Sequence, residues 1–136
     1  MSRATVLAVA VCALAACVSA DAPDNAAALG DIRGGRTGRE VVISGLVTHV
    51  YPPASGSFGE HEHFDVSVNE GAATQSISIE DNISIGAAPP VHPGDAVVIK
   101  GVLELDMTGP VIHWTHHDPS FRHVPGFVKV GGRTYD

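Results

Sequence analysis

Residues 95–106 read DAVVIKGVLELD, and they carry the clearest strand pattern in this chain of 136 residues. Their aliphatic side chains are mostly β-branched, and Gly101 stands near the centre, where a strand can bend. Residues 61–69, HEHFDVSVN, show a second pattern, because two sets of side chains alternate with the period of two that a strand imposes. Both stretches therefore predict β-strands.

Further strand patterns lie on both sides of these two, and the segments between them contain prolines and glycines that favour loops. Strands are predicted at residues 40–51, 61–69, 75–80, 95–106 and 111–115, with a hairpin at 126–135. Residues 51–59 are predicted as a loop, and residues 81–94, with three prolines and two glycines, are not expected to form a long helix. This pattern predicts an all-β fold, a small five- to seven-stranded barrel of the OB type. A β-sandwich is the alternative, because strand count alone does not distinguish the two.

The N-terminus has the layout of a signal peptide of the lipoprotein type, predicted at residues 1–16. Arg3 precedes an apolar run that ends Leu14-Ala15-Ala16, and Cys17 then stands where a bacterial lipobox places the lipidated cysteine. We therefore expect an exported periplasmic or cell-envelope lipoprotein, attached to a membrane by its lipid. Cleavage after Ala20 would instead give a soluble secreted protein.

The composition predicts how the rest of the chain is organised and which partners are unlikely. Residues 17–39 are rich in Ala, Gly and Asp and are predicted to be a flexible tether, so the barrel domain is expected at residues 40–136. Both cysteines lie within the first 17 residues and cannot form a disulfide framework. Fifteen acidic against eight basic side chains give a formal charge of -7, which makes nucleic acid an unlikely partner.

Histidine is the unusual residue in this composition, with eight copies, of which six lie in two short stretches around residues 61–63 and 113–123. Imidazoles without thiols suit zinc or divalent copper. The predicted ligands are His61, His113, His116, His117 and His123, with His63, Asp65 and Trp114 in supporting positions. On a strand, His61, His63 and Asp65 would share one face.

Simpler interpretations exist for several of these residues. A single surface histidine is usually only a solvated polar side chain, and we assign His49 and His92 to that class. Trp114 is expected to be a core side chain, and Asp118 before Pro119 is equally suited to capping a turn. Four histidines between residues 113 and 123 are more than chance would place there, so the group indicates a site even though each histidine taken alone does not.

The run HWTHHDPSFRHVPGF at residues 113–127, followed by GGRTY at 131–135, resembles the signature of an uncharacterised family of secreted bacterial proteins, domain of unknown function 3465. The resemblance extends to an Asn-Ile pair, which adds Asn82 to the supporting residues. It departs at Phe121, where glycine is usual, at Phe127, where tryptophan is usual, and at Asp81, where histidine is common. The resemblance implies a barrel-like secreted domain and no known reaction.

Three functions are consistent with these observations. The first is a histidine-rich module that binds a divalent metal. The second is a metal-dependent hydrolase of the phosphodiesterase or nuclease type, with His117, Asp118 and Arg122 as candidate catalytic residues. The third is a structural or partner-binding barrel of the envelope. Three converging imidazoles would favour the first two, whereas exposed aromatic side chains on one face would favour an extended ligand.

Overall fold

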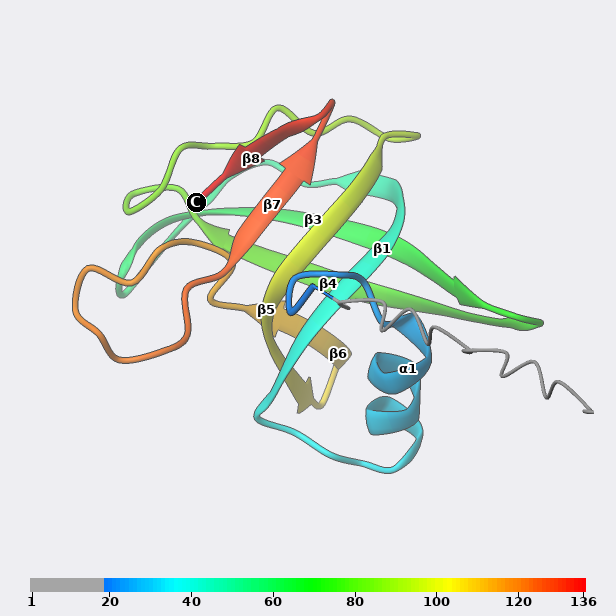
Figure 1. Ribbon diagram of the computed structural model, residues 1–136. Helices are drawn as coiled ribbons and strands as arrows, with labels where there is room; N and C mark the ends of the chain where they lie inside the picture. Colours follow the sequence, from blue (N-terminus) through cyan, green and yellow to red (C-terminus); the bar gives the residue numbers. More distant parts are fainter. Residues whose placement is uncertain (1–18) are drawn as a thin grey trace, which may run out of the picture.

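The computed structural model describes residues 19–136 and shows one barrel with a short helix beside it (Figure 1). The predicted signal peptide and the predicted lipidation site Cys17 lie outside the described residues. None of the helices within residues 19–136 has the length and apolar character needed to cross a membrane. The elements are α1 (Asn25–Arg33), β1 (Arg39–Val50), β2 (Ala54–Gly56), β3 (Gly59–Glu70), β4 (Ala73–Asn82), β5 (Ala96–Asp106), β6 (Gly109–His113), β7 (Phe127–Val130) and β8 (Arg133–Tyr135).

Five strands close the barrel in the order β1-β3-β4-β6-β5, because β1 also pairs with β5. Four of the five pairings are antiparallel, and β4 with β6 is parallel. β7 pairs with β5 and carries β8 at its outer edge. A closed five-stranded barrel of this kind confirms the predicted small OB-like barrel, and the β-sandwich alternative is wrong.

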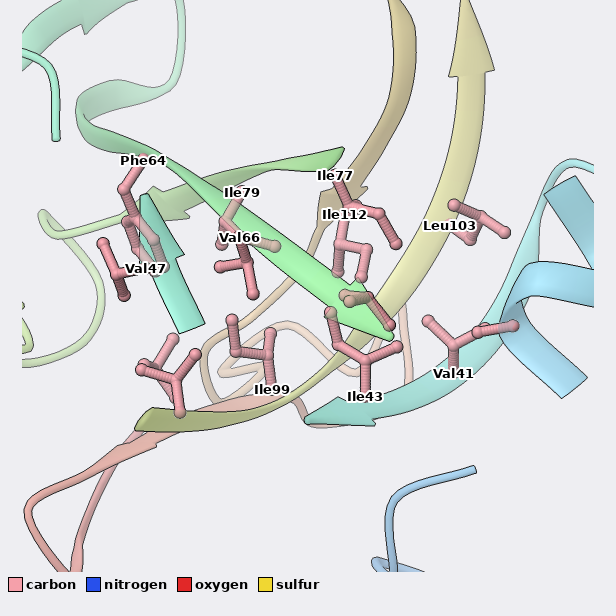
Figure 2. Close-up of a cluster of buried hydrophobic side chains, with 14 of the residues drawn as sticks. Val41, Ile43, Val47, Phe64, Val66, Ile77, Ile79, Ile99, Leu103 and Ile112 are labelled. Carbon is pink, nitrogen blue, oxygen red and sulfur yellow. The ribbon is translucent and has the colours of Figure 1, made fainter. Parts of the chain in front are cut away.

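The alternation predicted on residues 61–69 is confirmed by burial. Phe64, Val66 and Val68 are completely buried, whereas the intervening side chains of β3 remain partly accessible. Isoleucines and valines from the facing strands fill the rest of the core (Figure 2). At Gly101 a Cβ atom would overlap the carbonyl oxygen of His113, so only glycine lets β5 approach the end of β6 so closely.

Residues 25–33 differ from the flexible tether predicted for residues 17–39, because they form α1. Asp24 caps the helix by accepting a hydrogen bond from the Ala27 amide at 2.9 Å, and Leu29 joins the core. The Asn25 side chain donates to the carbonyls of Ser44 and Asn69, both at 3.0 Å. The Ala-rich composition that suggested a tether is equally favourable for a helix.

Residues 51–59 are not wholly a loop, because β2 pairs with the start of β3 through Ala54 and His61. The turn between these strands carries Phe58, which is 84% exposed. The predicted hairpin at 126–135 forms as β7 and β8, with Gly131 and Gly132 both at positive φ in its turn. The long segment between β6 and β7, residues 114–126, is the site loop, and it lies on the opposite side of the barrel from α1 in Figure 1.

Candidate functional site

A cavity of about 750 Å³ opens where the outer face of β3 and β4 meets the site loop. Its walls come from the β2–β3 turn, β3, the ends of β4 and β6, and the site loop. We call it the histidine pocket, because five imidazoles line it: His61, His63, His113, His116 and His123. Its charged lining side chains are those of Glu80, Asp118 and Arg122. Segments more than 50 residues apart in the sequence thus meet in one concave site.

Most of these imidazoles are fixed through one ring nitrogen. Nδ1 of His61, His116 and His123 lies 3.2, 2.6 and 2.9 Å from the carbonyl oxygens of Gly59, His117 and Val124. A carbonyl oxygen only accepts, so Nδ1 must carry the proton in each ring. The neutral ring then has its free lone pair on Nε2. The site loop and the start of β3 therefore set the tautomer of three pocket histidines.

Glu80 joins the other two pocket histidines across neighbouring strands. Its carboxylate lies 3.0 Å from Nδ1 of His113 on β6 and 3.8 Å from Nδ1 of His63 on β3. His63 and Glu80 are direct cross-strand partners in the β3–β4 register. All three side chains are about one-third exposed, so this group is open to solvent and to a ligand.

His116 is the most buried of the pocket histidines, with 3% of its surface exposed. Burial lowers its pKa, and the neighbouring charges of His123 and His117 act in the same direction. The hydrogen bond to the His117 carbonyl and the charge of Asp118 oppose this without reversing it. His116 is therefore neutral at pH 7 and has an accepting Nε2.

Exposed apolar side chains form the rim of the pocket. Phe58 is 84% exposed, Trp114 is 45% exposed, and Ile85 is 36% exposed. The expectation that Trp114 belongs to the core is wrong, because its backbone is left-handed at φ 58° and turns the side chain out of the strand direction. Its ring lies 4.6 Å from that of His123, measured between centroids. A strained tryptophan at a concave site is typical of a functional position.

The site loop is closed at its base by Gly126. The Gly126 amide donates to the His116 carbonyl at 2.9 Å, and a Cβ atom at this position would overlap the carbonyl oxygens of Trp114 and Lys100. Glycine is therefore required where the two ends of the loop meet. This contact places Trp114 and His116 on the pocket wall.

Asp118 caps the turn inside the site loop. Its carboxylate accepts from the amides of Ser120 at 2.9 Å and His123 at 2.6 Å. Burial alone would raise the pKa of Asp118, but these backbone donors, together with the Arg122 amide, outweigh it and the pKa is lowered. Asp118 is thus an ionised loop cap, in agreement with the simpler of its two interpretations.

Asn82 holds the opposite rim in place. Its side-chain amide donates to the Phe58 carbonyl at 2.9 Å, and its side-chain oxygen accepts from the Ser84 amide at 3.1 Å. The Ser84 hydroxyl in turn accepts from the Glu60 amide at 2.8 Å. Asn82 is only 5% exposed, so it acts as a positioning residue for the turn that carries Phe58.

A pair of inward carboxyl groups lies behind the pocket wall, and the sequence analysis overlooked it. Glu62 and Asp81 are direct cross-strand partners, and Asp81 accepts from the buried Thr115 hydroxyl at 2.8 Å. Burial raises the pKa of Glu62 to about 7, with a further contribution from the charge of Asp81. Burial also raises the pKa of Asp81 to about 6, against the Thr115 hydrogen bond and the charge of His61. The available signal was the position of Glu62 on the apolar face of β3.

Two predicted site residues lie away from the histidine pocket. His117 is exposed and is not part of the lining. Asp65 shares a strand face with His61 and His63, but its carboxylate accepts from the hydroxyls of Tyr51 at 2.8 Å and Ser78 at 2.7 Å. Within residues 19–136, no group of three or more His, Cys, Asp or Glu side chains is arranged to hold a metal ion.

Comparison with known proteins gives the family of the chain and no activity. No curated protein and no solved structure matches it. The model of one family, described as a protein of unknown function (DUF3465), matches residues 10–136. This match spans the whole barrel, α1 and the site loop, so the chain belongs to the DUF3465 family.

Proposed function

We propose that this protein is a binding module of the bacterial envelope, and that its ligand occupies the histidine pocket. The observation that supports this best is the convergence of five histidines with exposed Phe58 and Trp114 on one cavity of about 750 Å³. This volume falls within the range of about 300–1,000 Å³ that is usual for small-molecule sites. Export, by way of Cys17 or by ordinary cleavage, remains part of the proposal.

Binding is better supported than hydrolysis, because the candidate catalytic residues are poorly placed. His117 is outside the pocket lining, and the Asp118 carboxylate already accepts from two backbone amides. A general base needs an accessible lone pair within hydrogen-bond distance of its substrate. Arg122 lines the pocket, where it is available as a hydrogen-bond donor to a ligand.

A chemically diverse fragment screen tests the binding function. We expect fragments of at least one class to change the fluorescence of Trp114, the single tryptophan of the chain, and to shift the imidazole NMR signals of His61 and His123. His116→Ala should abolish these responses, whereas His117→Ala, outside the pocket, should leave them unchanged. Fragments of every class leaving the pocket signals unchanged would contradict the proposal.

A divalent metal such as zinc or copper is the second candidate ligand, and one observation favours it. Nδ1 of four pocket histidines faces a carbonyl or carboxylate acceptor, which is how metal-binding imidazoles are commonly oriented. The site would still need side-chain movement to bring three ligands together. Elemental analysis after dialysis against trace zinc and copper should give about one equivalent if this is correct, and none in His116→Ala.

A further inference from the structure

Several hydrogen-bonding groups of the histidine pocket are acceptors. With Nδ1 protonated against a carbonyl, His61 and His116 each keep an accepting Nε2, whereas Nε2 of His123 faces the Asp118 carboxylate at 3.9 Å. The Glu80 carboxylate adds two accepting oxygens on the same surface. The donors beside them are the guanidinium of Arg122, the indole N–H of Trp114 and the hydroxyls of Ser55, Ser57 and Ser120, which can also accept. A complementary ligand therefore presents several donors, as a row of hydroxyl groups does.

The charge of the pocket disfavours an anionic ligand. Its lining holds one arginine against two carboxylates, and burial keeps His116 neutral. Asp118 does not lose its charge, because backbone donors hold its pKa low. The whole chain is also acidic, at -7. A phosphate-bearing or carboxylate-bearing polymer would meet repulsion here, whereas a neutral ligand would not.

The apolar rim requires a ligand with an apolar face. Phe58 and Trp114 present exposed rings from two different segments, and Ile85 adds an aliphatic surface between polar groups. The face of an aromatic ring is electron-rich and attracts polarised C–H groups. Sugar rings combine such C–H faces with hydroxyl groups at their edges.

We propose that the ligand of the histidine pocket is a neutral oligosaccharide, whose hydroxyl groups donate to the imidazole Nε2 atoms and Glu80 while its ring faces stack on Phe58 and Trp114. This assignment rests on the proposed binding function. Asn82 and Gly126 hold the two stacking surfaces in place, because each fixes the backbone next to one of them. The rim is thus arranged before the ligand arrives, which reduces the entropic cost of binding.

The experiment titrates the protein with neutral tetrasaccharides of glucose, N-acetylglucosamine, mannose and galactose, with Trp114 fluorescence and histidine NMR signals as readouts. We expect at least one to bind, and expect Phe58→Ala and Trp114→Ala each to weaken it roughly three- to tenfold, the effect of losing one stacked ring. The affinity of Trp114→Ala is read from the histidine NMR signals alone, because this variant has no tryptophan. Phe121→Ala is the matched control, because Phe121 is 95% exposed in the site loop but does not line the pocket. Phe121→Ala should change the affinity less than twofold.

Several outcomes would overturn the saccharide assignment. The assignment would be wrong if none of the tetrasaccharides saturated the protein at 10 mM, because a dissociation constant above roughly this value means negligible affinity. Tighter binding of tetragalacturonate or of a thymidine oligonucleotide would show that the ligand is anionic. Equal effects of Phe58→Ala and Phe121→Ala would show that the rim does not make the contact. If fragments of other classes still bind in the screen above, the binding function stands and only the ligand class is wrong.

Discussion

The barrel and the site loop are held together by different kinds of contact. The barrel core consists of many completely buried side chains, such as Ile79, Ile99 and Ile112, that pack against one another from different strands (Figure 2). The site loop has few such contacts and is held by single polar or steric contacts, chiefly those of Asp118 and Gly126. A core that packs through many residues tolerates a single substitution better than a loop that is held by one or two contacts. The shape of the histidine pocket therefore depends on fewer residues than the fold does.

Gly126→Ala should produce the largest effect, because it acts where the loop joins the barrel. The new Cβ would overlap two backbone carbonyl oxygens, which no side-chain rotation relieves. We expect a loss of about 2–3 kcal/mol in the free energy of unfolding. We also expect a change in the fluorescence of the native protein, because Trp114 moves. Urea unfolding followed by fluorescence and by far-UV circular dichroism measures both effects.

Gly30→Ala in α1 is the matched control for that substitution. A Cβ atom at Gly30 has no neighbour closer than 3.9 Å, and alanine is the better helix former by about 1 kcal/mol. It should leave stability unchanged or slightly increased and should not alter Trp114 fluorescence. Equal destabilisation by the two alanines would show that the site loop is not specially dependent on its glycine.

Glu62→Gln should have the next largest effect, and its sign depends on pH. Glu62 has a folded pKa of about 7 against an ordinary value of 4.5, so the folded protein binds the proton more tightly than the unfolded chain. Stability therefore falls as pH rises between these values, and the loss is complete above the folded pKa. After allowance for the half-buried position of Glu62, we expect the amide to be more stable than the carboxylate by about 1–2 kcal/mol at pH 8.

Urea titrations at pH 4.5 and pH 8 measure this difference. Wild type and Glu62→Gln should differ little at the lower pH, where the carboxyl group is protonated in the folded protein and about half protonated in the unfolded chain. Glu60→Gln is the control, because Glu60 is exposed two residues earlier on the same strand. A pH-independent difference between Glu62→Gln and wild type would show that proton binding is not the cause.

Much of the fold could be predicted from the sequence because strand periodicity directly reports burial. The alternation of residues 61–69 separates Phe64, Val66 and Val68 from the histidine face, and these three side chains are buried in the structure. The helix α1 was missed because it buries only Ala28 and Leu29, too few side chains to produce a periodic pattern.

The pocket could be predicted only in part, because the sequence of one strand does not determine which residues of the neighbouring strand lie opposite it. Sequence spacing suggested Asp65 as the supporting carboxylate beside His61 and His63, since all three lie on one face of β3. The structure instead pairs His63 with Glu80, its neighbour on β4, and joins His113 to the same carboxylate. Likewise, the density of histidines predicted a cluster, but the outward turn of Trp114 depends on a backbone angle that no residue pattern revealed.

Phe121→Gly should have the smallest effect and should separate loop strain from ligand contact. Phe121 has a left-handed backbone at φ 53° and a side chain that is 95% exposed, so phenylalanine gains little there and bears the strain of that conformation. Glycine, which the family resemblance makes the usual residue at this position, adopts the same angle without strain. We expect Phe121→Gly to raise the free energy of unfolding by about 1 kcal/mol and to leave saccharide affinity unchanged. A lower stability, measured by urea unfolding, would mean that Phe121 makes a stabilising contact. A lower affinity would mean that the stacking surface extends beyond Phe58 and Trp114 into the tip of the site loop.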